Sequence, residues 1–451
     1  MAQQTNEIVP IRTIVILAFS ATAGVLVEFY DFFIFGYAAA SAFPKVFFPG
    51  LPPTVALVLS YLTFGAGFPA RLLGAFIFGH FGDHVSRKYS FVINILIVGA
   101  ATVLTGLLPG YATLGLAAPI LLVALRVVQG IGLGGEFGGA SSLLAEFGAK
   151  RRHRAFWMSL ANLGIPGGAM LASAVLFTLS GTFATTGWRV AMLLSAVIIV
   201  PALFARYKLT ETPLFEQLKQ RDQLAKLPSF DVLKRHARPV FLLALLSAFQ
   251  QMDGYVSGTY TISFMKSAGI PLSTVAMIIF LSRIGDIAGV TLSGPFADIF
   301  KRKSVGYVAI VITTALSLPF VLAILQKQVL WVLVLQFFMT FFGIGLLHGL
   351  APILTSESFP TRYRYSGTGI AYSLSAIFGG MIAPSLLAAL IGHDVAGKWY
   401  FVPIVYLIYC VIAVVSLPFI RETRDLTLEQ LDRDESMPEN AAVARSPTRR
   451  A

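Results

Sequence analysis

One short charged pattern occurs twice in this chain. Residues 79–88 read GHFGDHVSRK, and residues 294–303 read GPFADIFKRK. In both copies a Gly is followed four positions later by Asp, then four positions later by Arg and at once by Lys. Each copy lies between two long apolar segments, and nearly half the chain separates them. Such a repeat predicts a duplicated membrane protein of two lobes, the architecture with which secondary transporters expose one site to either side in turn.

Apolar segments dominate the rest of the sequence. The chain is 56% hydrophobic and 12% charged, about half the charged fraction typical of soluble domains. It contains about twelve apolar stretches of roughly 20 or more residues, each long enough to cross a bilayer as a helix. The expected spans are 13–38, 55–79, 89–108, 117–147, 155–179, 188–207, 239–265, 273–297, 304–325, 330–356, 366–391 and 400–420. The predicted fold class is therefore an all-α membrane protein, with twelve transmembrane helices in two pseudo-symmetric six-helix lobes.

Changes in composition divide the chain into four parts. The polar interruption between the sixth and seventh spans predicts a linker, and the polar stretch after the last span predicts a disordered tail. The expected parts are an N-terminal lobe at 1–207, a cytoplasmic linker at 208–238, a C-terminal lobe at 239–420 and a cytoplasmic tail at 421–451.

The net charge of +12 follows from orientation and not from a nucleic-acid partner. With the N-terminus inside, most of the 34 lysines and arginines fall on the inner side of the predicted topology. The exceptions are Lys45, Arg189, Lys266, Lys327 and Lys398 outside, and Arg71, Arg126 and Arg283 within helices. This asymmetry is the positive-inside rule, so both termini are predicted to be cytoplasmic.

Cysteine usage argues against a metal centre. The single Cys410 lies in the last predicted helix, so no disulfide and no thiolate metal cluster are expected. We expect no metal and no cofactor other than protons as the coupling ion. The first apolar stretch contains Glu28 and Asp31 and is too long for a removed signal, so it is predicted to stay as a helix.

Several motifs resemble one transporter family over about residues 10–420. The repeated pattern is similar to the loop signature of the major facilitator superfamily, although His84 and Ser86 depart from its usual form. RVVQGIGLGGEFGG at 126–139 resembles the fourth-helix motif of proton-coupled members. GVLVEFYDFFIFG at 24–36 and ESFPTRYRYSGTG at 357–369 are similar to the metabolite:proton symporter branch. The resemblance implies import of organic acids such as citrate, oxoglutarate or shikimate, or of zwitterionic osmolytes, together with protons.

Asp31 and Arg126 are the first candidates for proton coupling. Both lie about nine residues from the outer ends of their predicted helices, so at 1.5 Å per residue they share a depth. A salt bridge between them is geometrically possible and would suit a proton switch. The resemblance also places a proton acid on helix 1 and its Arg partner on helix 4. The alternative is a static buried pair that holds the two helices together.

Two further acids belong to the same group. Glu28 lies one helical turn before Asp31 on the same helix face. Glu136 lies deeper on helix 4, within a glycine run that we interpret as a helix-packing surface and not as a phosphate loop. For Glu136 itself, a proton-accepting role and a structural role remain equally open.

Arg71 is the leading candidate for a substrate contact. A charge at the bilayer centre costs at least about 2.5 kcal/mol on insertion scales, so each such charge indicates a function. Arg71 stands in the same place relative to the first motif as Asp286 does relative to the second. Its forked guanidinium suits a carboxylate ligand. Gln250, Asp253 and Tyr255 on helix 7 are expected to line the same cavity, whereas Arg283 and Asp286 can simply neutralise each other.

The repeated motif predicts a conformational latch on the cytoplasmic side. Each Asp is expected to lie against the positive N-terminal end of a neighbouring helix, and each Arg to meet a carboxylate at a helix end. Topology alone explains the basic residues but not the aspartates. The expected latch residues are Gly79, Asp83, Arg87, Lys88, Glu146, Gly294, Asp298, Arg302, Lys303 and Glu357.

These observations predict a proton-coupled symporter of the inner membrane that imports a small carboxylate-bearing metabolite. A facilitator or an exporter with the same fold is the alternative. A non-transporting sensor is disfavoured, and so is an enzyme, because no nucleophile–base pair or metal-ligand set is visible. The expected partners are a small organic acid anion or zwitterion, protons and the lipid bilayer, with no nucleic acid, and the protein is expected to be monomeric.

Overall fold

The computed structural model describes residues 11–84, 87–134, 154–207, 228–359, 364–424 and 430. Regular structure in these residues is helical. The helices of the N-terminal lobe are α1 (Ile11–Ser41), α2 (Phe43–Phe47), α3 (Pro53–Gly65), α4 (Gly67–His84), α5 (Arg87–Leu107), α6 (Tyr111–Leu114), α7 (Ala117–Leu133), α9 (Arg154–Ser159), α10 (Gly164–Thr178), α11 (Trp188–Leu193) and α12 (Ser195–Tyr207).

The second half of the chain repeats this arrangement. Its helices are α14 (Pro228–Arg235), α15 (Ala237–Tyr255), α16 (Thr261–Ser267), α17 (Leu272–Ile299), α18 (Arg302–Leu325), α19 (Val329–Met339), α20 (Leu347–Glu357), α21 (Arg364–Ser375), α22 (Ile382–Ile391), α23 (Val395–Lys398) and α24 (Phe401–Ser416). Left-handed glycines end two of the apolar segments, Gly269 (φ +86°) after α16 and Gly392 (φ +56°) after α22.

The helices have the length and surface of a membrane bundle. Among the described residues, nine helical segments are long and apolar enough to cross a bilayer, and 92–107 and 117–133 are shorter apolar helices. The remaining expected span, 239–265, is interrupted by Gln250, Gln251 and Asp253, all of which are buried. Large apolar side chains such as Leu407, Val411 and Val415 on α24 face outward. The twelve-helix, two-lobed prediction is confirmed.

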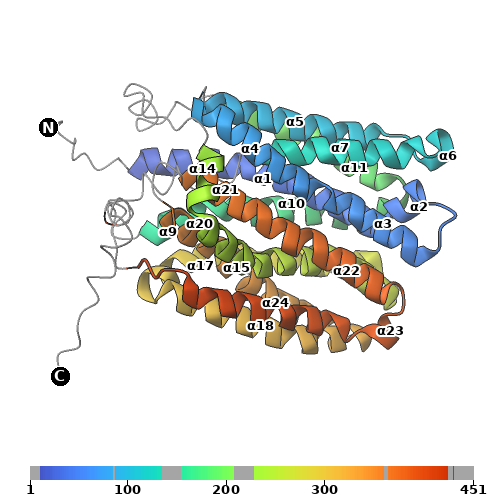
Figure 1. Cartoon of the computed structure of the whole chain (residues 1–451). Helices are drawn as coiled ribbons and strands as arrows, with labels where there is room; N and C mark the ends of the chain where they lie inside the picture. The colour runs from blue at the N-terminus through green and yellow to red at the C-terminus, as the bar shows by residue number, and fades with distance from the viewer. Residues whose placement is uncertain are drawn as a thin grey trace.

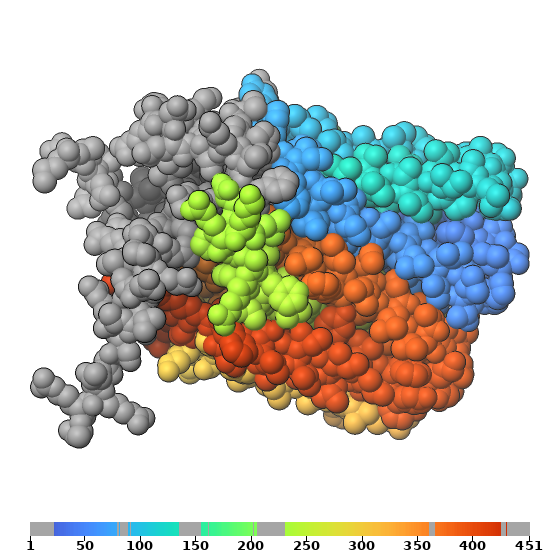
Figure 2. Space-filling model, in the orientation of Figure 1, coloured from blue at the N-terminus to red at the C-terminus, as the bar shows by residue number. Residues whose placement is uncertain are grey.

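The two lobes pack along two seams. On one, α9 and α10 of the N-terminal lobe contact α17, and on the other, α3 and α4 contact α22 and α21. Figure 1 shows the two halves side by side, with α9 and α14 at one end of the bundle and α2, α6 and α23 at the other. We call these the latch end and the far end. Helix α14 contacts both α4 and α21, and in Figure 2 it lies across the junction of the two halves.

Glycines let helices approach closely in both lobes. A Cβ atom on Gly130 or Gly134 would collide with the backbone of Gly67 or Arg71, which places α7 directly against α4. In the second lobe, a Cβ on Gly285 would lie 3.0 Å from Thr340 Oγ1 and closer still to a backbone carbonyl of α19. The start of the glycine run on helix 4 is thus a packing surface, as predicted.

Three helices of the C-terminal lobe contain a π-helical turn. The turns lie at Val256–Tyr260, Thr340–Leu346 and Ala376–Met381. Each joins two α-helical segments of one predicted span, and each contains at least one glycine. Such turns insert an extra residue and occur frequently at functional sites.

Candidate functional site

A chain of hydrogen bonds joins Arg126 to Asp31 through two neutral side chains. Arg126 Nη1 donates to Gln129 Oε1 at 2.5 Å, and Gln129 Nε2 donates to Thr102 Oγ1 at 2.8 Å. Thr102 Oγ1 in turn lies 2.9 Å from Asp31 Oδ2, to which it can donate. These groups come from α7, α5 and α1, and all are buried. Asp31 and Arg126, the predicted coupling pair, thus lie in one buried hydrogen-bonded chain, with Gln129 and Thr102 between them.

No direct ion pair forms between Asp31 and Arg126 in this conformation. The guanidinium of Arg126 lies instead over the rings of Phe32, Phe35 and Phe64, with Cζ 4.1–4.8 Å from the ring centroids. Arg126 Nε also donates to the carbonyl oxygen of Phe64 at 3.0 Å. Ring faces and neutral dipoles thus hold this cation, and Asp31 is held by a hydroxyl.

Arg71 and Tyr372 meet across the junction of the lobes. The Arg71 guanidinium on α4 lies over the Tyr372 ring on α21, 5.0 Å from its centroid. Arg71 is 2% exposed, and no described carboxylate forms an ion pair with it. Gln251 and the buried carboxyl of Glu28 lie near the same tyrosine. Arg71 is therefore a buried cation at the junction of the lobes that forms no ion pair with a described residue, and a carboxylate ligand would be compensated there.

The other predicted substrate contacts divide between two places. Tyr255 lies at the centre, where its ring packs against Phe32, Phe64 and Phe68 of the N-terminal lobe at 5.1–5.6 Å. The carboxyl of Asp253 faces into the C-terminal lobe, where Oδ1 accepts a 2.6 Å hydrogen bond from Tyr406. Gln250, one turn earlier, is buried on the same helix.

Arg283 and Asp286 form the expected pair within α17. Arg283 Nη1 lies 3.4 Å from Asp286 Oδ2, and both side chains are buried. The guanidinium also lies 5.0 Å from the ring centroid of Phe33 on α1. Asp286 is thus paired within its own helix, whereas Arg71, at the equivalent position of the first lobe, has no ion pair with a described residue.

The second copy of the motif makes a contact of the kind that the latch prediction requires. The Asp298 carboxylate accepts hydrogen bonds from the backbone N–H groups of Ala155 and Phe156, each at 3.3 Å, at the first turn of α9 in the opposite lobe. Gly294 allows this contact, because a Cβ there would lie 2.8 Å from Ala155 O and closer to Phe156 Cα. The latch end of this conformation is therefore closed by the motif itself.

The basic half of the motif binds within its own lobe. Arg302 Nε lies 2.8 Å from Glu357 Oε2, and Arg302 Nη2 lies 3.0 Å from Glu357 Oε1, so the pair is bidentate and buried. Glu422 accepts hydrogen bonds from the backbone N–H groups of Arg302 and Lys303 at 3.2 Å. These contacts hold the start of α18, next to the end of α17 that carries Asp298.

Replacing Asp298 by Asn should weaken closure of the latch end. The amide keeps one acceptor but loses the negative charge that faces the helix N-terminus, which should cost about 1–2 kcal/mol. The measurement is the labelling of single cysteines placed at the two ends, in a background without Cys410. The ratio of latch-end to far-end labelling should change about five- to thirty-fold.

Asp394→Asn is the matched control for this test. Asp394 also caps a helix, since its Oδ1 accepts from Gly397 N at 3.0 Å, but that contact stays within one lobe at the far end. An unchanged labelling ratio in Asp298→Asn would show that Asp298 serves topology alone.

The structure does not describe the side chains of the remaining predicted residues. Glu136 and Glu146 lie outside the described residues, and so do the side chains of Gly79, Asp83, Arg87 and Lys88. Their roles remain predictions.

The far end is closed by side chains of both lobes. Tyr61 on α3 shares a 2.9 Å hydrogen bond with Ser263 on α16 and lies 3.3 Å from the carbonyl oxygen of Thr259. Ser263 Oγ also lies 3.1 Å from the Ala40 carbonyl oxygen on α1. We call these contacts the far-end gate. Because lobe-to-lobe contacts exist at both ends, the structure is an occluded conformation.

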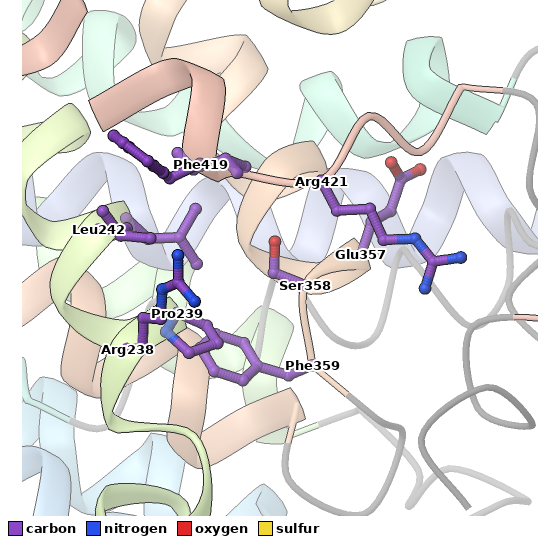
Figure 3. A pocket seen from close by; sticks show the side chains of 10 residues that line it. Arg238, Pro239, Leu242, Glu357, Ser358, Phe359, Phe419 and Arg421 are labelled. Atoms are coloured by element: carbon purple, nitrogen blue, oxygen red, sulfur yellow. The ribbon is translucent and has the colours of Figure 1, made fainter. Parts of the chain in front are cut away.

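A cavity of about 310 Å³ lies beside the Arg302–Glu357 pair. Figure 3 shows Arg238, Pro239 and Leu242 on one side of it, with Phe419 and Arg421 on the other and Ser358 and Phe359 between. Every lining residue belongs to the C-terminal half of the chain, so this cavity does not lie on the path between the lobes.

Four side chains that contact the predicted site residues were not singled out from the sequence: Thr102, Gln129, Tyr372 and Tyr406. Gln129 stands three residues after Arg126, and that spacing is a usable signal because it places both on one helix face. The other three are hydroxyl-bearing residues in apolar helices, where their type is common and their partners are on distant segments.

Comparison with known proteins agrees with this geometry. The sequence profile described as "Major Facilitator Superfamily" matches residues 21–384. The chain is 36% identical to an inner membrane metabolite transport protein, YhjE, of Escherichia coli over 397 residues, covering 85% of this chain and 89% of that protein. It is 31% identical to the shikimate transporter of Escherichia coli over 417 residues, covering 90% and 94%.

A third relative and one solved structure complete the comparison. The proline/betaine transporter of Salmonella typhimurium is 30% identical over 413 residues, covering 88% of this chain and 81% of that protein. The structure of the proton:xylose symporter XylE bound to 6-bromo-6-deoxy-D-glucose superimposes with a TM-score of 0.71 at 18% identity, covering 93% of this chain and 98% of that one. At this identity, the likeness to the XylE structure concerns the fold alone.

Proposed function

This chain belongs to the major facilitator superfamily of membrane transporters, and from that premise we propose that it is a proton-coupled symporter importing a small organic acid. It is a transporter and not an enzyme. The observation that carries the proposal is the buried relay from Arg126 through Gln129 and Thr102 to Asp31. A carboxyl that is held by a hydroxyl, with a cation two side chains away, can gain or lose a proton as the helices shift.

The substrate class follows from Arg71. Its guanidinium is buried at the junction of the lobes over the face of the Tyr372 ring, and it forms no ion pair with a described residue. A carboxylate can accept two parallel hydrogen bonds from such a group. The names of two relatives, a shikimate and a proline/betaine transporter, both refer to carboxylate-bearing solutes.

The orientation completes the proposal. The basic residues are concentrated toward the latch end in the predicted topology, so we assign this end to the cytoplasm and the far end to the outside. Import then begins at the far-end gate, with closure of the latch behind the released substrate.

Uptake into proteoliposomes tests the function as a whole. An imposed pH gradient, acidic outside, should drive accumulation of a labelled organic acid such as shikimate beyond its equilibrium level. Uptake that equilibrates but never concentrates would identify a facilitator instead, and efflux driven by the inverse gradient alone would identify an exporter.

Replacing Arg71 by Lys should weaken binding of a carboxylate substrate by about 1–3 kcal/mol. Lysine keeps the charge but loses the two-pronged geometry of the guanidinium. The measurement is substrate affinity by thermal shift or by isothermal titration of the purified protein.

Arg189→Lys is the control for this substitution. Arg189 donates to the carbonyl oxygens of Gly106 and Leu108, so its replacement should affect stability while affinity stays the same. If Arg71→Lys behaves like this control, Arg71 is a structural residue and does not contact substrate.

A further inference from the structure

The far end contains a second cavity, of about 380 Å³, that both lobes line. The N-terminal lobe contributes the end of α1, α2 and the start of α3, and the C-terminal lobe contributes α16 and His393. Neither Arg71 nor Arg126 lines it, so it is separate from the central site. Its volume lies in the range of pockets that bind small molecules.

The polar lining of this far-end cavity is basic. Lys45 and Lys266 both line it, and no carboxylate does. Neither ammonium group has a hydrogen bond or an ion pair with another described residue. Burial and the neighbouring charge of Lys45 lower the pKa of Lys266. Two like charges without a counter-ion make a site that an anion would stabilise.

The acidic residue next to His393 in the sequence, Asp394, already has a hydrogen-bond partner. Asp394 follows His393, but its Oδ1 accepts the hydrogen bond from Gly397 N that caps α23. His393 itself lies 3.1 Å from Ser267 Oγ through Nδ1, so two further polar groups face the lining beside Lys266. Phe48, Leu51 and Leu57 supply an apolar wall. This combination suits an organic anion better than a small inorganic one.

The floor of the cavity is the far-end gate. Ala40 and Ser263 both line the cavity, and they are joined by the hydrogen bond from Ser263 Oγ to the Ala40 carbonyl. Tyr61, which is bonded to Ser263, packs against Tyr260 at 5.9 Å, and Phe64, one turn further along α3, lies against the Arg126 guanidinium. An anion bound in the cavity would therefore lie next to the lobe-to-lobe contacts that must break for import.

We propose that this cavity is an outer binding site for a small carboxylate anion, which Lys45 and Lys266 hold before the far-end gate opens. The proposal rests on the proposed function, because it supplies the first contact for the substrate of the central site. It adds a role for the charges at this end, where steering of an anion increases its local concentration.

Protection from acetylation tests the site without any transport. Full-length protein in detergent micelles is treated with a water-soluble acetylating ester, and acetylation of individual lysines is followed by mass spectrometry. Shikimate or citrate should slow the acetylation of Lys45 and Lys266 several-fold, whereas Lys398 serves as the exposed reference at the same end. Equal slowing of all three lysines, or the same protection by potassium chloride at matched ionic strength, would overturn the site.

Uptake kinetics test whether the site serves transport. The double variant Lys45→Gln, Lys266→Gln should raise the KM for shikimate uptake about ten-fold at low salt while Vmax is unchanged. Lys398→Gln should leave both parameters unchanged. A wild-type KM in the double variant overturns the proposal. Absence of pH-driven uptake by the wild-type protein would refute the proposed function instead, and the protection experiment would still decide whether the anion site exists.

Discussion

Replacement of Asp31 by Asn is expected to abolish accumulation of substrate against its gradient, while exchange of substrate across the membrane continues. Asn has nearly the same shape, and its Oδ1 can still accept the hydrogen bond from Thr102 Oγ1. The amide does not titrate, so the transporter would cycle without a proton. Labelled substrate under an imposed pH gradient should then reach only the level that its own gradient sets.

Two further variants make this test specific. Asp231→Asn makes the same chemical change on α14, outside the predicted spans, and should transport normally. Thr102→Val removes the hydroxyl that connects Gln129 to Asp31 and should reduce accumulation without abolishing it. Normal concentrative uptake by a correctly inserted Asp31→Asn protein would exclude Asp31 as the proton carrier. A silent Thr102→Val would exclude the relay while leaving Asp31 in question.

Substitutions at two glycines should open the two ends of the protein separately. A side chain at Gly294 would collide with the α9 backbone at Phe156 and Ala155, so Gly294→Val should separate the lobes at the latch end. A side chain at Gly36 would collide with Thr259 across the lobes, on the far-end side, so Gly36→Ala should have the opposite effect. Overpacking of this kind costs about 1–3 kcal/mol, equivalent to a five- to 150-fold shift between conformations.

The direction of each shift can be measured with single cysteines at the two ends, after Cys410 has been replaced. Gly36→Ala has a matched rescue, because Thr259→Ser removes the methyl group that causes the collision and keeps the hydroxyl. No such rescue substitution exists for Gly294, because the atoms nearest to its added side chain include the backbone of Phe156 and Ala155. Identical labelling patterns in the two glycine variants would mean that these contacts are not the closing surfaces of the two ends.

The sequence was sufficient to predict the architecture and the contacts of the second motif copy for a simple reason. The repeated motif is local, and its partners are backbone groups and helix ends whose positions follow from the duplication. Asp298 against the first turn of α9 and Arg302 against Glu357 are both of the expected kind. The glycines of helix 4 could likewise be interpreted correctly, because close packing requires only that a side chain be absent.

Residues whose partners lie on other helices were harder to predict. Equal depth placed Asp31 and Arg126 at one level, but depth does not specify helix rotation, and Thr102 and Gln129 lie between them. Asp253 was expected beside the substrate, yet its carboxyl turns toward Tyr406. Tyr372 carries no charge, so nothing in the pattern distinguished it from a packing residue before Arg71 was seen over its ring.

The π-helical turns of the C-terminal lobe have a consequence for the duplication itself. One inserted residue rotates every later side chain of a helix by about 100° relative to its start. Residues beyond Tyr260, Leu346 and Met381 therefore face other directions than their counterparts in an uninterrupted copy would. Ser263 of the far-end gate lies just after the first of these turns, so its direction toward Tyr61 and the Ala40 carbonyl depends on the inserted residue. Two halves built on one plan therefore need not present matching side chains to the space between them.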